Sequence, residues 1–230
     1  MKKGIIAFIL LASLFSQASH AQQKPFVFGF KVAPNTGWFK TDAEGYENIG
    51  TQPGFSWGFI ALFNLMEHYS LGTGFNVVYL NAKLRNPHLE VSDGDTLNGI
   101  MESKYRTKYI QIPLVFNMET RDFGRFRFYG QIGLGTSFLI GANADNTFSY
   151  EGGSETEDKV DIYDDLRFIR ESLIVGAGAK FIIEGSTLIF ANITFDNGFT
   201  NVLKGNNTAH PSISQRANTN FIEFQIGMLF

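Results

Sequence analysis

Residues 220–230, NFIEFQIGMLF, carry the pattern that decides the fold. Apolar and polar or small side chains alternate there at a spacing of two, with Ile222, Phe224, Ile226, Met228 and Phe230 in the apolar row. Successive side chains of a β-strand point to opposite faces. A terminus usually frays unless it is tied down, whereas this pattern continues to an aromatic last residue. The stretch therefore predicts a strand with one face in an apolar medium.

Composition narrows the class of protein. The chain has 230 residues, 24 of them Phe and 24 Gly, which suits one domain built on a sheet that is apolar on one side and crowded on the other. A net charge of -3 gives no reason to expect a nucleic-acid partner. The absence of cysteine excludes disulfides, thiol catalysis and cysteine zinc sites.

The first residues have the pattern of an export signal. A basic MKK precedes the apolar GIIAFILLASLF, and Ser19 and Ala21 occupy the small positions before a cleavage site. We expect cleavage after Ala21, so that residues 1–21 are a signal peptide and residues 22–230 are the barrel domain. The alternative, an uncleaved anchor, is disfavoured because the apolar core is too short to span a bilayer.

Seven further stretches alternate like the last one. They cover about 26–38, 55–63, 69–80, 109–117, 126–138, 172–181 and 189–196. Eight strands of about ten residues are typical of an outer-membrane barrel. A soluble β-sandwich also alternates, so the connections have to decide between the two.

The connections alternate regularly between long and short. The long ones are about 39–54, 81–103, 140–169 and 197–218, and the short ones lie near 64–67, 118–124 and 184–186. Outer-membrane barrels combine short periplasmic turns with long extracellular loops. We therefore predict an all-β fold, a transmembrane up-and-down antiparallel β-barrel of eight strands. Both termini are expected in the periplasm and the long loops outside.

The two rows of side chains predict which face meets lipid. The row opposite the aromatic one contains Lys31, Arg127, Lys180, Asp196 and Glu223, and a charge facing lipid near the midplane costs about 2–4 kcal/mol. The aromatic row should therefore face outward. Eight strands leave an interior that side chains can fill, and the many inward glycines make room for the few large ones. We expect no open pore.

Three sets of site residues follow from this arrangement. Lys31 and Glu223 should form an interior charge pair where the first and last strands meet. Lys104, Arg106 and Lys108 share the outward parity but lie beyond the apolar row, at the expected height of outer-leaflet headgroups and lipopolysaccharide phosphates. Plain solubilising charge is the alternative for these three. Phe230 resembles the terminal signal that barrel-insertion machinery recognises.

No motif predicts chemistry. The Gly-x-Gly pairs at 72/74, 133/135 and 176/178 lack the βαβ unit of a nucleotide site. The acidic stretch near 151–165 lacks the ligand spacing of a calcium loop. A catalytic triad in the loops, built on His88 or His210, is the enzymatic alternative, but only geometry can identify a triad. We expect no enzyme, cofactor or metal.

Two stretches resemble a known family. KYIQIPLVFNM (108–118) resembles the fourth-strand signature of PorT-like outer-membrane β-barrel proteins of Bacteroidetes-type, Gram-negative bacteria. GFTNV (198–202) resembles the turn after their seventh strand. Pro113, inside the first stretch, cannot donate to a ladder and predicts a bulge.

The resemblance implies a barrel and, less specifically, a role. Some PorT-like proteins take part in type IX protein secretion and in gliding, which implies an accessory that contacts secretion-system components. A surface adhesin or ligand-binding barrel that acts through its long loops is the other possibility. The expected partners are outer-membrane lipid, lipopolysaccharide and the insertion machinery, with the chain as a monomer and no nucleic acid.

Overall fold

The computed structural model describes residues 24–92, 95–184 and 187–230, so the predicted signal peptide lies outside the described residues. Most of this part of the chain is strand. The strands are β1 (Phe26–Lys40), β2 (Glu47–Met66), β3 (Tyr69–Ser92), β4 (Asp95–Glu119), β5 (Phe126–Tyr150), β6 (Gly153–Asp161), β7 (Ile169–Glu184), β8 (Thr187–Gly198) and β9 (Asn218–Leu229). A single turn of 3₁₀ helix, η2 (Tyr163–Asp165), follows β6. No helix among the described residues is long and apolar enough to cross a membrane.

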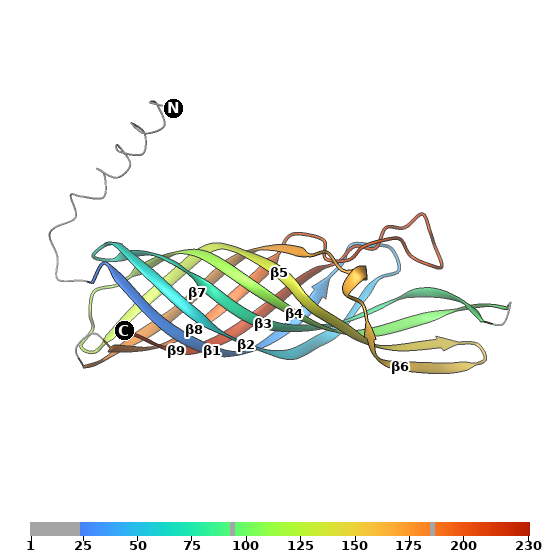
Figure 1. The fold of residues 1–230 in the computed structure, drawn as a ribbon, viewed down its shortest axis with the longest axis horizontal. Helices are drawn as coiled ribbons and strands as arrows, with labels where there is room; N and C mark the ends of the chain where they lie inside the picture. The colour runs from blue at the N-terminus through green and yellow to red at the C-terminus, as the bar shows by residue number, and fades with distance from the viewer. Residues whose placement is uncertain (1–23, 93–94, 185–186) are drawn as a thin grey trace, which may run out of the picture.

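Eight strands close into a ring, as the alternation predicts. Neighbours pair antiparallel in the order β4-β3-β2-β1-β9-β8-β7-β5, and a β4–β5 ladder closes the circle. β6 lies outside the ring and pairs only with the far part of β5. Figure 1 shows the tilted strands of this barrel, with the described ends of the chain and the short turns at one end. We call this the turn end and the opposite one the loop end.

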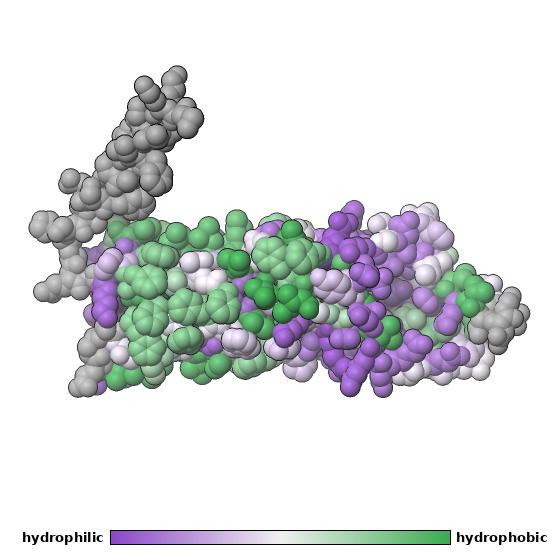
Figure 2. Space-filling view, viewed as in Figure 1, coloured by the Kyte–Doolittle hydropathy of each residue, from purple (hydrophilic) through white to green (hydrophobic). Residues whose placement is uncertain are grey.

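The two rows of side chains lie where the sequence predicts. On β1, Phe30 and Val32 are 59% and 52% exposed, whereas their neighbours Lys31 and Ala33 are 6% and 0% exposed. Figure 2 shows the outward apolar side chains as a band that covers the half of the barrel near the turn end. On the face shown in Figure 2, the other half is mainly hydrophilic. The band is the part of the molecule whose height and composition fit a membrane.

Three of the predicted long loops are largely strand. β3 and β4 have 24 and 25 residues and continue their ladder through most of 81–103, while β5 and β6 form a second hairpin within 140–169. β2 likewise begins at Glu47, inside the predicted loop 39–54. The alternation of apolar and polar side chains ends at the edge of the band. Beyond that edge the outward face of the sheet no longer meets an apolar medium, and the inward face no longer lines the polar interior. The backbone hydrogen bonds between the strands do not depend on this pattern, so the ladders continue.

The bulge predicted at Pro113 is absent. The β3–β4 register is the same on both sides of it, with Gly72 opposite Val115 and Asn76 opposite Gln111. The rungs between these pairs are missing, and the Thr73 hydroxyl donates to the Pro113 carbonyl oxygen at 2.9 Å. The proline therefore interrupts the hydrogen bonding without inserting a residue. The register shift of β4 lies instead against β5, between Lys108 and Tyr109.

A closed ring predicts resistance to detergent. Since each of the eight strands of the ring is paired on both sides, unfolding must break many ladder bonds together. We expect the unboiled protein, extracted from outer membranes, to migrate differently from the boiled protein on a denaturing gel. Equal migration of the two samples would contradict the closed barrel.

Candidate functional site: a filled interior and a closed loop end

The first interior feature is an ion pair between the first and last strands. Lys31 Nζ lies 2.7 Å from Glu223 Oε1, and both side chains are about 5% exposed. The register sets Lys31 opposite Gly227 and Glu223 opposite Asn35, so the lysine side chain runs along the interior to reach its partner. Glu223 also accepts hydrogen bonds from the Ser56 hydroxyl and from Gln225 Nε2. The carboxylate is thus shared by β1, β2 and β9.

A second buried pair lies nearer the loop end. The Arg170 guanidinium donates to Asp196, and Arg170 is only 1% exposed. Asp196 Oδ2 also accepts from Gln111 Nε2 at 2.8 Å and from the Ser172 hydroxyl at 3.1 Å. Arg170 was not among the predicted interior residues because the predicted strand began at residue 172. Extending the alternation by one step would have placed Arg170 in the inward row.

A third ionic group closes the interior near the turn end. Glu119 accepts from Lys180 on β7 and from Arg127 on β5. Arg127 also donates from Nε to Asp122 at 2.7 Å in the β4–β5 turn, and this hydrogen bond lowers the pKa of Asp122. The sequence predicts that Lys180 and Arg127 point inward but does not identify Glu119 as their shared partner. Such ties hold together strands that lie far apart in the chain.

Side chains fill most of the remaining interior. One cavity of about 70 Å³ remains among the three ionic groups, lined by Lys31, Lys180, Asp196, Glu223 and their neighbours. Two inward glycines show how tightly the groups pack. A Cβ at Gly135 would lie 2.9 Å from Gln111 Nε2, and one at Gly198 would lie 3.1 Å from an Arg170 nitrogen. Larger residues there would displace the Asp196 network.

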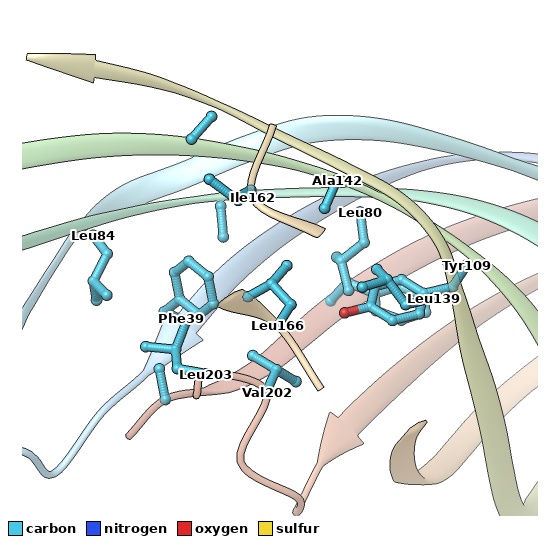
Figure 3. Close-up of a cluster of buried hydrophobic side chains, with 14 of the residues drawn as sticks. Phe39, Leu80, Leu84, Tyr109, Leu139, Ala142, Ile162, Leu166, Val202 and Leu203 are labelled. Carbon is cyan, nitrogen blue, oxygen red and sulfur yellow. The ribbon is translucent and has the colours of Figure 1, made fainter. Parts of the chain in front are cut away.

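The loop end of the interior is apolar rather than ionic. Residues of the strand ends and of the long connections form one buried cluster, most of it shown in Figure 3. Leu166, next to η2, and Val202 and Leu203, from the β8–β9 connection, fold back into the barrel mouth and are at most 2% exposed. They pack on strand residues such as Phe39, Leu80 and Tyr109. The barrel is therefore closed at its loop end by a small hydrophobic core.

Two asparagines fix the connection that supplies this core. Asn201 Nδ2 donates to the carbonyl oxygens of Leu203 and Gln215, and its Oδ1 accepts from the backbone N–H groups of Leu203 and Ala217. Asn207 donates to the Tyr46 hydroxyl and accepts from two backbone N–H groups. In the 198–202 motif, Asn201 thus fixes the backbone of the connection through its hydrogen bonds, and Val202 packs into the apolar cluster.

Two titratable groups of the loop end are shifted by burial. Burial raises the pKa of Tyr46, against a smaller opposite effect of its hydrogen bond with Asn207. Burial also lowers the pKa of His88, which lies edge-on to Phe148 and beside the Thr208 hydroxyl. His88 thus joins the β3–β4 hairpin to the β8–β9 connection.

The remaining predicted residues lie apart from these groups. Lys104, Arg106 and Lys108 point outward on β4, where Arg106 pairs with Asp145 and Lys108 lies 5.2 Å from the centre of the Tyr79 ring. Phe230 pairs with Phe28 through two backbone hydrogen bonds, and its recognition by insertion machinery stays a prediction. Within the described ranges, no group of three His, Asp or Glu side chains is placed to hold a metal.

Comparison with known proteins agrees with this geometry. The family model described as outer membrane protein beta-barrel domain matches residues 15–204. Neisserial surface protein A has a similar structure, with 10% identity and a TM-score of 0.50 over 90% of this chain and 96% of that one. OprG of Pseudomonas aeruginosa gives 10% identity and a TM-score of 0.45 over 89% and 93% of the two chains. A search of curated protein sequences finds no match.

The Lys31–Glu223 pair predicts a non-additive response to mutation. Glu223→Ala should lower the free energy of unfolding by about 3–5 kcal/mol, because it leaves a buried ammonium without its counter-ion. Lys31→Ala/Glu223→Ala should be less destabilised than Glu223→Ala alone. Urea titrations of the refolded barrel in lipid vesicles measure both values. Asn192→Ala, which removes a buried amide without a charged partner, serves as the reference, and additive single effects would disprove the coupling.

Proposed function

The chain belongs to the outer membrane protein beta-barrel domain family, and we propose that it is a non-catalytic barrel that binds partners through its loop end. The observation that carries this proposal is the length of β3, β4 and β5, which have 24, 25 and 25 residues. A tilted strand needs only about 9–11 residues to cross a bilayer. More than half of each strand therefore lies beyond a membrane that covers the apolar band.

The shape of the projecting part supports binding by contact. The β3–β4 and β5–β6 hairpins extend past the rest of the barrel as one sheet (Figure 1). Near the tip of β3–β4, Val91 is 68% exposed and Ile100 is 48% exposed. β6 adds an exposed acidic stretch that contains Glu155, Glu157 and Asp158. The sheet thus offers an apolar tip and an acidic edge on a rigid support.

The filled interior of the barrel also supports binding by contact. Three ionic groups and the apolar core of the loop end occupy the lumen, and the cavity among them measures only about 70 Å³. A few water molecules fit such a volume, but a peptide or a sugar does not. We therefore propose a role in binding at the surface and not the passage of a peptide or a sugar through the barrel.

Shortening one hairpin tests the contact role. In a variant that joins Arg85 to Glu102 through a two-residue turn, the barrel should keep its heat-dependent gel shift, because the membrane ladders are intact. Cells that display the full barrel should adhere to plates coated with extracellular-matrix protein or with mucin more than barrel-free cells do. The shortened variant should fall to the barrel-free level. Equal adherence of all three strains on both coatings would refute the proposal.

A role as an accessory of type IX secretion is a second candidate, suggested by the PorT-like resemblance. One feature of the turn end favours it. Arg121 and Arg125 are exposed in the β4–β5 turn, and neither guanidinium forms an ion pair within the described part of the chain, whereas Asp122 is held by Arg127. Two free cations on an ordered turn could contact an acidic surface in the periplasm.

Deletion of the gene tests the secretion role. If the barrel serves secretion, type IX cargo should accumulate in the periplasm of the deletion strain while other outer-membrane proteins keep their levels. Arg121→Ala/Arg125→Ala should reproduce part of this defect at normal barrel abundance, because it leaves the Asp122–Arg127 bond intact. Cargo that reaches the surface normally in the deletion strain would exclude the role.

A further inference from the structure

The outer wall of β3 and β4 carries a cluster of cations just beyond the apolar band. Lys83 lies directly opposite Lys104 in the ladder, and four rungs nearer the band Tyr79 lies opposite Lys108. All three lysines are half-buried and share the outward parity of Ile110. We call Lys83, Lys104 and Lys108 the lysine cluster. Lys83 lies on β3, so the pattern of cations along β4 could not predict that it belongs to the cluster.

The neighbouring charges leave the lysine cluster unneutralised. Arg85 pairs with Glu102 and Glu47, and Arg106 pairs with Asp145. Asp145 lies opposite Lys104 in the β4–β5 ladder, but its other oxygen accepts from the backbone N–H of Lys159. In the described ranges no ion pair reaches Lys83, Lys104 or Lys108. Like charges directly opposite each other destabilise an antiparallel pair, so an anion from outside the protein would stabilise this one.

The height of the cluster indicates which anion is available. The apolar outward rows end at Ile110 on β4 and at Tyr79 on β3, where Tyr79 adjoins the exposed rings of Phe55 and Trp57. Aromatic belts of this kind mark the boundary between hydrocarbon and headgroups. Lys83 lies four residues beyond Tyr79, about 13 Å of strand, which a tilt of about 40° reduces to roughly 10 Å above the belt. Headgroup phosphates lie at that level, and flexible lysine side chains can bend toward them.

We propose that the lysine cluster binds the phosphate group of an anionic lipid in the leaflet at the loop end. With the loop end of the barrel on the outer side of an outer membrane, that lipid is lipopolysaccharide. Lys83 and Lys104 would donate to the phosphate from two strands, with Lys108 and the Tyr79 ring beneath them at the glycolipid–acyl boundary. The apolar row that begins at Ile110 would then contact the acyl chains.

Lipopolysaccharide titrated against the labelled, folded barrel in zwitterionic detergent tests the site. Lys83→Gln/Lys104→Gln should weaken binding at least tenfold, because each lysine supplies a charge-assisted contact. Lys159→Gln/Lys204→Gln removes the same charge from the loop region and should leave binding within twofold of wild type. Equal losses in the two double variants would show that only net charge matters and would overturn the site.

A charge reversal separates the site from a general loss of stability. Lys83→Glu places a carboxylate opposite Lys104 without setting it opposite Asp145, so it should raise the temperature at which the gel band converts in lipid-free detergent while abolishing lipopolysaccharide binding. Wild-type affinity in this variant would refute the proposal. Lipopolysaccharide stripped of its phosphates should not bind to the wild type. Displacement of lipopolysaccharide by millimolar inorganic phosphate would instead assign the cluster to a free anion and would overturn the lipid assignment.

Discussion

The structure depends on one constraint, the need of every backbone N–H and C=O group for a partner where no water is available. An antiparallel sheet meets this constraint in lipid only if it has no edge. The β1–β9 and β4–β5 ladders remove the edges by joining the sheet to itself. Closure with eight strands then fixes a narrow interior. Every inward side chain has to fit that interior, and every outward one has to suit the surroundings at its height.

The narrow interior explains why the charges occur in shared groups. Glu119, Asp196 and Glu223 come from β4, β8 and β9, and each accepts hydrogen bonds from at least two other strands. A buried charge without partners is far more costly than one with several. The same groups tie strands that are not neighbours in the ladder, such as β4 to β7 and β4 to β8. They therefore resist deformation of the ring in directions that backbone bonds do not control.

The sequence predicts the membrane part of the fold because period-two alternation is strong there. All eight predicted strands coincide with strands of the ring, apart from Phe230, which follows the end of β9, and the apolar row faces outward. The hairpin extensions were missed because no lipid faces them, so the pattern that reveals a strand is lost. Arg170 and Glu119 lie near strand ends, where a two-residue error in the boundary hides an inward side chain. The partner of Lys180 could not be predicted, since β4 and β7 are not adjacent in the ring.

The strand β3 shows why the two halves of the barrel are different physical systems. Near the turn end its outward side chain Phe75 is apolar and its inward side chain Asn76 is polar. Beyond Tyr79 the order is reversed, with Lys83 outward and Leu80 and Leu84 inward in the apolar core. Lipid supplies the apolar contact for the first half, while the β8–β9 connection supplies it for the second. Because that core is made by the protein alone, the loop end can stay ordered wherever the membrane ends, which is what a surface that works by contact requires.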